Sequence, residues 1–215
     1  MDDAQRASGE RSAAPRKDVF RAFIAADLDE SARAAAAQLT LRLREGASPD
    51  VRWVRPEALH VTLRFLGNIS PEQVEPLGRS VGTAVAEHSP FRLELGTVHY
   101  FPSPRRPRVV ALELAPEAAL VELAAAVERG TRAEGFEPEQ RPFRPHLTLG
   151  RVKSGRPPAT RGLAAPSGSG CAVSEVVLFR SELRREGAKY TPLERMPLSA
   201  RTGGASLSPL SAKES

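Results

Sequence analysis

The residues best suited to chemistry in this 215-residue chain are two histidines that stand in one short repeated pattern. Residues Arg55–Leu63 read Arg-Pro-Glu-Ala-Leu-His-Val-Thr-Leu, and residues Arg141–Leu149 read Arg-Pro-Phe-Arg-Pro-His-Leu-Thr-Leu. In both copies three residues separate Arg-Pro from His-x-Thr-Leu, and the chain contains only four histidines. The shared pattern indicates that His60 and His146 perform related tasks.

Two imidazoles in one cleft suit a reaction that takes one proton and gives another. The unperturbed pKa of histidine, about 6.5, makes both protonation states available near neutral pH. A neutral histidine can remove a proton from water while a protonated one donates a proton to a leaving oxygen. The hydroxyls of Thr62 and Thr148, with arginine and backbone N–H groups, can bind the oxygens of a phosphate. The pattern therefore favours acid–base chemistry on a phosphate ester.

Other roles fit a single copy of the motif. A half-buried histidine that bonds to the backbone is the common case for one His-x-Thr-Leu, whereas two copies in register favour a catalytic pair. Histidine is also a zinc ligand, but catalytic zinc takes about three protein ligands. Neither motif has His, Cys, Asp or Glu two or four residues after its histidine. We therefore expect no metal and no cofactor.

For the motifs to act together, each must lie on a β-strand at the edge of a cleft. Side chains alternate along a strand, so in each motif the histidine and the threonine share one face. The two apolar residues of each motif then point to the other face, into a core, and their types suit a half-buried strand. Prolines at positions 56, 142 and 145 precede the strands, where a missing N–H costs least.

The elements around the motifs follow the same order in both halves of the chain. In the first half a strand predicted over Val19–Ala25 and a helix over Ser31–Arg44 precede the motif. In the second half a strand over Arg108–Leu114 and a helix from Pro116 to about Glu134 do so. This order predicts an internal duplication, with two pseudo-symmetric lobes that face each other across a central cleft.

The remaining segments complete one domain. The predicted elements are a helix from Ser70 to about Glu87 and strands at Phe91–Leu95, Val98–Phe101, Val173–Arg180 and Tyr190–Met196. Lys153–Gly170, rich in Gly, Pro and Ser, is predicted to form a loop or a weak helix. Residues 1–17 and 197–215 are predicted to be disordered tails, which leaves residues 18–196 as a single domain.

Composition indicates the kind of partner and the cellular compartment to expect for this chain. Its 31 Lys and Arg against 26 Asp and Glu give a net charge of +5, which fits a polyanionic partner such as RNA. A single cysteine excludes an internal disulfide and agrees with a reducing compartment. The sequence shows neither the apolar stretch of a secretory signal nor a run of 18 apolar residues. We expect a cytoplasmic monomer that does not enter a membrane.

These motifs resemble the 2H phosphoesterase superfamily, which is named for its paired His-x-Thr-x motifs. Within it the chain is most similar to the RNA 2′,3′-cyclic phosphodiesterases, also called 2′–5′ RNA ligases. The resemblance covers roughly Val19 to Leu193 and is most specific in the unbroken stretch from Trp53 to Gly67. It also includes Phe143–Arg151 and the Gly-Ala-Lys-Tyr at Gly187–Tyr190. The chain departs from the family in its longer tails and in the Gly/Pro-rich region after the second motif.

The resemblance implies a bilobal α+β fold of antiparallel sheets and helices, and metal-free hydrolysis of RNA 2′,3′-cyclic phosphate ends to 2′-phosphomonoesters. It makes His60 the proton donor to the departing 3′-oxygen and His146 the proton acceptor that activates water. The residues alone do not distinguish these roles. Thr62 and Thr148 would bind phosphate, and some members of the family also join RNA ends through a 2′–5′ bond.

Two other functions fit the same residues. One is a module that binds nucleotides or RNA ends without turnover, since some relatives of the family only bind. The other is a phosphodiesterase that acts on a small cyclic nucleotide such as ADP-ribose 1″,2″-cyclic phosphate. The presence of both histidines and both threonines favours a catalytic site over one that has decayed.

Several further residues are candidates for contacts with RNA or phosphate. They are Arg144, Arg151, Phe65, Phe101, Phe143 and Tyr100. Arg151 follows His146 by an odd number of residues, so on a regular strand it points to the opposite face and reaches the cleft only past a bulge or the strand end. Either arginine can equally be a solvated charge. The aromatic rings can stack a terminal base or pack in the core.

Overall fold

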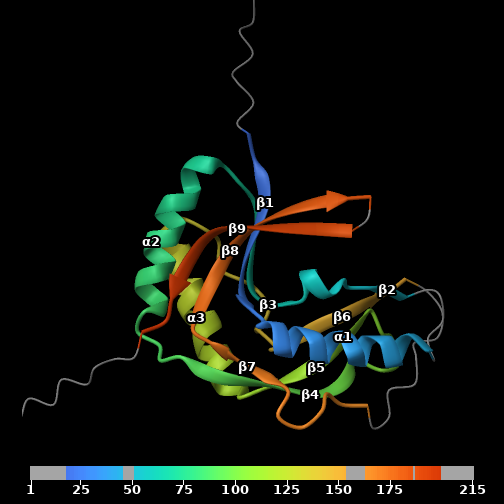
Figure 1. Cartoon of the computed structure of the whole chain (residues 1–215). Helices are drawn as coiled ribbons and strands as arrows, with labels where there is room; N and C mark the ends of the chain where they lie inside the picture. Colours follow the sequence, from blue (N-terminus) through green and yellow to red (C-terminus); the bar gives the residue numbers. More distant parts are fainter. Residues whose placement is uncertain (1–17, 46–50, 154–162, 186, 200–215) are drawn as a thin grey trace, which may run out of the picture.

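The computed structural model describes residues 18–45, 51–153, 163–185 and 187–199. Two antiparallel sheets form the centre of the molecule (Figure 1). Sheet A has the strand order β3 (His60–Ile69), β1 (Phe20–Asp27), β8 (Glu175–Arg184) and β9 (Gly187–Pro197). Sheet B has the order β2 (Val51–Trp53), β6 (Leu147–Val152), β5 (Val109–Ala115), β4 (Phe91–Phe101) and β7 (Gly170–Val173).

The predicted duplication is visible in how the motif strands pair. In each half the strand that carries His-x-Thr-Leu pairs with the strand that precedes the helix, β3 with β1 and β6 with β5. Helix α1 (Glu30–Glu45) follows β1, and helix α3 (Glu117–Ala133) follows β5. One strand of the first half belongs to the sheet of the second, because β2 precedes the first motif in the chain yet pairs with β6, the strand of the second motif. The two-lobed α+β fold expected from the resemblance is confirmed.

The helices lie on the outer sides of the two sheets. Helices α2 (Val74–Val85) and α3 pack against each other and contact β9 and β3 of sheet A, whereas α1 contacts β7 and the short 3-10 turn η1 (Pro56–Ala58) (Figure 1). Gly130 lets α2 and α3 approach closely, since a Cβ there would lie 2.6 Å from Cα of Val81. Ser70 and Gln73 cap each other's backbone at η2 (Pro71–Gln73), as expected for the start of this helix.

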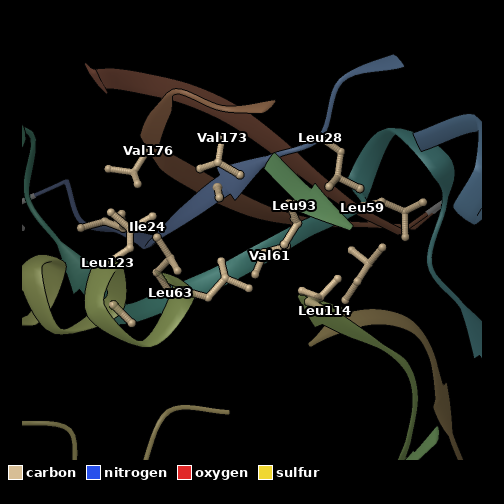
Figure 2. Packing of buried hydrophobic residues seen from close by; sticks show 14 of the residues in the cluster. Ile24, Leu28, Leu59, Val61, Leu63, Leu93, Leu114, Leu123, Val173 and Val176 are labelled. Carbon is tan, nitrogen blue, oxygen red and sulfur yellow. The ribbon is translucent and has the colours of Figure 1, made fainter. Parts of the chain in front are cut away.

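The apolar residues of both motifs face the core, as the alternation of side chains predicts. Val61 and Leu63 are buried and point from β3 toward Leu123 of α3 and Leu93 of β4 (Figure 2). The corresponding pair of the second motif, Leu147 and Leu149, is fully buried. Each such side chain contributes about 1.5–3 kcal/mol on burial, so the core fixes which face of each motif strand remains for the histidine.

Two predicted strand boundaries were wrong. Phe91–Leu95 and Val98–Phe101 form one strand, β4, whose register shifts between Leu95 and Val98 rather than ending there. The strand predicted at Val173–Arg180 is two strands, β7 in sheet B and β8 in sheet A, which separate at Ser174. A change of sheet within an apolar run leaves no mark in the sequence, because both strands need the same residue types.

The domain also extends slightly beyond its predicted end. Pro197 belongs to β9, and Leu198 is buried in the core and donates its backbone N–H to the carbonyl of Ser174 at 2.8 Å. These residues had been assigned to the tail. The predicted tail at 1–17, residues 200–215 of the other predicted tail, and residues 154–162 of the Gly/Pro-rich segment lie outside the described residues.

None of the helices in the described part of the chain is both long enough and apolar enough to cross a membrane.

Candidate active site

His60 lies at the start of β3 with both ring nitrogens bonded. Nδ1 is 2.8 Å from the carbonyl oxygen of Ala58, and Nε2 is 2.9 Å from the hydroxyl oxygen of Thr62. A carbonyl only accepts, so Nδ1 carries the hydrogen and Nε2 accepts from the threonine hydroxyl. The rings of Phe23 and Tyr190 pack against the imidazole at centroid distances of 4.6 and 5.0 Å.

This packing sets the resting protonation state of His60. Burial lowers the pKa of His60 to about 4, although the hydrogen bond to Ala58 and the charge of Asp27 act in the opposite direction. The charges of Arg33 and Arg151 lower it further. At neutral pH the free protein therefore holds His60 as a neutral imidazole.

We expect a histidine-selective NMR titration of the free protein to place the midpoint of His60 near pH 4. In an unfolded chain histidine protonates near pH 6.5, whereas in the folded chain His60 protonates only near pH 4. The contribution of His60 to the free energy of unfolding is therefore fully present above about pH 6.5 and is lost as the pH falls to about 4. The His60→Gln variant identifies the resonance. A midpoint near 6.5 in the free protein would contradict the burial that the structure assigns to this ring.

Helix α1 holds the segment that leads into His60. Arg33 donates from one guanidinium nitrogen to the carbonyls of Pro56 and Leu59, at 2.8 and 2.9 Å. Its other terminal nitrogen lies 2.7 Å from a carboxylate oxygen of Asp27, which pairs with His60 in the β1–β3 ladder. Arg33 thus fixes the backbone that precedes the imidazole and holds the side chain of Asp27 on the neighbouring strand. No sequence pattern marks this role, because Arg33 is one of several arginines in its helix.

His146, directly before β6 of sheet B, is held in the same manner. Its Nδ1 is 2.8 Å from the carbonyl oxygen of Arg144, two residues earlier, as in the Ala58–His60 pair. The same tautomer follows, with Nε2 as the accepting nitrogen. The ring of Phe101 stacks on the imidazole at 5.4 Å and 23°, and the guanidinium of Arg144 lies 5.6 Å from the centre of the Phe101 ring. Phe101 thus supports His146 rather than lying free to stack a base.

A bulge in β3 brings Phe65 to the face of the motif threonine. Thr62 pairs with Ala25 of β1, and Phe65 pairs with Phe23. Because the β1 residues are two apart, they share a face, and so do their partners. The three-residue spacing from Thr62 to Phe65 is accommodated by an extra residue, Leu63, at the register shift. Phe65 is 61% exposed on this face.

An equivalent bulge occurs in β6. Thr148 pairs with Ala111 of β5, and Arg151 pairs with Val109. The extra residue is Leu149, which stands one position after the threonine, as Leu63 does in the first motif. Arg151 therefore lies on the face of Thr148, because the bulge offsets the odd spacing that would place it on the opposite face of a regular strand. Phe65 and Arg151 are equivalent positions of the duplication, each five residues after its histidine.

Arg151 links the two lobes. It belongs to sheet B, yet its positive charge lowers the pKa of His60 in sheet A. Tyr190 also lies in sheet A; burial raises the pKa of its phenol, and the charge of Arg151 acts to lower it. Strands β3 and β6 also contact each other (Figure 1). Arg151 therefore acts on the histidine of the first motif from a strand of the second that contacts β3.

The other candidates occupy less central positions. Tyr100 and Phe143 are partly buried and pack against the main core, which fits the packing alternative. Arg144 is exposed and contributes its carbonyl to His146 and its guanidinium to the ring of Phe101. The structure adds Phe23 and Tyr190, which enclose His60.

Arg64, in the middle of β3, connects the first motif strand to the loop before the second motif. Its side chain is 7% exposed and lies 2.6 Å from the carboxylate of Glu128 on α3. It also donates to the carbonyl of Glu137 and lies 3.9 Å from the carboxylate of Glu139. These contacts fix the start of the segment that runs to His146.

Replacing Arg64 with methionine is expected to lower the free energy of unfolding by about 2–3 kcal/mol. Loss of one partner of a buried ion pair costs about 3–5 kcal/mol, and water reaching Glu128 reduces that figure. The matched control is Arg79→Met, which breaks the exposed pair with Glu75 and should cost about 0.3 kcal/mol. Equal urea midpoints for the two variants would show that Arg64 does not hold the loop.

Among the residues that the structure describes, no three His, Cys, Asp or Glu side chains gather in a group that could hold a metal ion.

Comparison with known proteins agrees with this architecture. The family model described as LigT-like phosphoesterase matches residues 27–111 and again residues 112–190, so each match contains one His-x-Thr-Leu motif. The chain belongs to this family. The two matches also confirm that the halves are related to each other.

Individual relatives extend the match over most of the chain. The RNA 2′,3′-cyclic phosphodiesterase of Methanothermobacter thermautotrophicus is 35% identical over 182 residues, which cover 81% of this chain and 96% of the relative. That of Thermus thermophilus is 36% identical over 195 residues, 86% of this chain and 93% of the relative. The chain spans only 56% of the Geobacillus stearothermophilus protein of the same name, at 34% identity over 82% of this chain.

Solved structures show the same two-lobed family fold. The apo form of Escherichia coli LigT has a TM-score of 0.70 and 29% identity to this chain, covering 85% of it and 99% of LigT. The complex of E. coli LigT with 3′-AMP has a TM-score of 0.69, 29% identity, and coverage of 85% and 100%.

Proposed function

We propose that this phosphoesterase hydrolyses RNA 2′,3′-cyclic phosphate ends to 2′-phosphomonoesters with His60 and His146 as its acid–base pair. The observation that carries the proposal is Arg151: it follows the second motif, yet its charge reaches the histidine of the first. A guanidinium that stands on the strand of the second motif and acts on the histidine of the first suits a phosphate anion, which needs a charge partner and two proton-transfer groups. The relatives from M. thermautotrophicus and T. thermophilus are RNA 2′,3′-cyclic phosphodiesterases, which supports RNA as the substrate.

In the proposed reaction, Nε2 of His146 takes a proton from water as the water oxygen forms a bond to phosphorus. The bond between phosphorus and the 3′-oxygen breaks, and protonated His60 gives its Nε2 proton to that oxygen. The product is a 2′-phosphate and a free 3′-hydroxyl. With the 5′-hydroxyl of a second RNA in place of water, the same groups would join two ends through a 2′–5′ bond while the same bond to the 3′-oxygen breaks. This division of roles comes from the resemblance to the 2H phosphoesterases.

The resting state of His60 adds a condition to this scheme. Its imidazole is neutral in the free protein, where burial lowers its pKa to about 4. An anionic phosphate beside it would offset the charge of Arg151 and raise that pKa. Substrate binding would thus favour the protonated form of His60, which the proton donor needs. Protonation of Nε2 would also end its bond from the Thr62 hydroxyl and release that hydroxyl, with the Thr148 hydroxyl, to bind phosphate oxygens.

The experiment that tests the proposed function is product analysis on an oligoribonucleotide that ends in a 2′,3′-cyclic phosphate. We expect a 2′-phosphate product, formed equally well in the presence of EDTA. A 3′-phosphate product would contradict the roles assigned to the histidines. Tight binding without hydrolysis would identify a binding module, and faster turnover of ADP-ribose 1″,2″-cyclic phosphate would identify a small-nucleotide enzyme.

A further inference from the structure

A cavity of about 380 Å³ lies between the η1 segment and the β8–β9 hairpin. From the η1 segment it is lined by Arg55, Glu57 and Ala58, and from the hairpin mainly by Arg184, Lys189 and Tyr190. These two segments contact each other through η1 and β9. The cavity is therefore built from elements far apart in the chain, with β9, the edge strand of sheet A opposite to β3, on one side.

This cavity adjoins the environment of His60 through two shared residues. The carbonyl of Ala58 accepts the Nδ1 hydrogen of His60 at 2.8 Å, and Ala58 also lines the cavity. The ring of Tyr190 meets the His60 imidazole edge-on at 5.0 Å and lines the cavity as well. A ligand that reached from His60 past Tyr190 would enter the cavity directly.

The charges around the cavity favour an anion. Three of its lining residues are cationic, Arg55, Arg184 and Lys189, whereas Glu57 is the acidic one among its described residues. The Arg55–Glu57 pair is long, at 3.6 Å, and both side chains are more than half exposed. An exposed ion pair of this kind contributes little to stability. Arg55 can therefore exchange its contact with Glu57 for one with a phosphate.

We propose that this cavity binds the phosphodiester backbone of the RNA strand on the 5′ side of the terminal nucleotide. The inference rests on the proposed function, which places the terminal cyclic phosphate between the two histidines. An oligonucleotide must then continue away from His60 through its 5′-phosphates, and the cationic cavity next to Tyr190 offers them partners. A mononucleotide 2′,3′-cyclic phosphate has no such strand and gains nothing from the cavity. The cavity would make oligonucleotide ends better substrates than free cyclic nucleotides.

The test compares the Arg184→Ala/Lys189→Ala double variant with the unaltered protein on two substrates. The first is 2′,3′-cyclic AMP, and the second is a pentaribonucleotide that ends in the same cyclic nucleotide. We expect KM for the pentanucleotide to rise about tenfold, with kcat unchanged and with turnover of cyclic AMP unchanged. The salt dependence of log(kcat/KM) for the pentanucleotide should weaken by about 1.4 in slope, because two phosphate contacts are lost on a single strand.

The matched control is Arg129→Ala/Arg132→Ala, which removes two exposed arginines from α3, a helix that packs against the other face of sheet A. It should leave both substrates and the salt slope unaltered. If the unaltered protein acts on neither substrate, the proposed function fails. If it acts on both and the cavity variant affects neither, or both equally, the cavity inference fails while the function stands.

Discussion

Replacing His146 with alanine is expected to lower kcat/KM on a cyclic-phosphate oligonucleotide by about 10²–10⁴-fold, and replacing His60 should do the same. Each variant removes one proton transfer from the transition state and leaves the other imidazole in place. Because the two act as a unit, the double variant should be little worse than the poorer single variant. Steady-state kinetics at neutral pH measures all three.

His88→Ala is the matched control for these losses, since His88 lies just beyond the end of α2 and donates its backbone N–H to the carbonyl of Val85 at 3.0 Å, outside both motifs. It should keep the activity of the unaltered protein. Retention of activity within about tenfold in both single variants would remove the acid–base pair from the account. Circular dichroism on each variant separates loss of chemistry from loss of fold.

Replacing Arg151 with methionine should lower kcat by about 10²–10³-fold, the cost typical of removing one group that stabilises charge in a transition state. The charge of Arg151 acts on His60, and the residue lies on the face of Thr148, where the phosphate is proposed to bind. Lysine at this position should recover part of the loss, because it keeps the charge but not the two-pronged geometry. Kinetics on the same oligonucleotide measures both variants.

A second readout separates a charge role for Arg151 from a structural one. Its charge lowers the pKa of His60, so Arg151→Met should raise the His60 titration midpoint in the free protein, whereas Arg151→Lys should not. Arg92→Met, which removes an exposed arginine of β4 paired with Glu94, should change neither kcat nor the midpoint. An Arg151→Met protein with full activity would show that the phosphate lies elsewhere.

The alternation of side chains was enough to predict which residues of each motif face the core. Val61 and Leu147 had to be buried once the motifs were placed on strands, and that left His60 and His146 on the open faces. The repeated order of strand, helix and motif predicted an internal duplication, and both motif strands do pair with the strand before the helix. Both inferences depend on local periodicity and order, which a sequence carries directly.

The residues that complete the site depend on tertiary structure. Arg151 reaches the cleft because β6 contains a bulge at Leu149, and no local pattern marks that extra residue. Tyr190 contacts His60 only because β9, the last strand of the chain, belongs to the same sheet as β3, the strand of His60. The low pKa of His60 follows from burial by these neighbours, so it was invisible while the histidine was considered alone.

The most direct test of the whole account is a crystal structure with 2′-AMP, which carries the proposed product group. We predict its phosphate between Nε2 of His60 and Nε2 of His146, with oxygens about 2.6–3.2 Å from each, and within reach of the Arg151 guanidinium. A phosphate bound by one imidazole alone, with the other turned to a separate surface, would contradict the shared acid–base site.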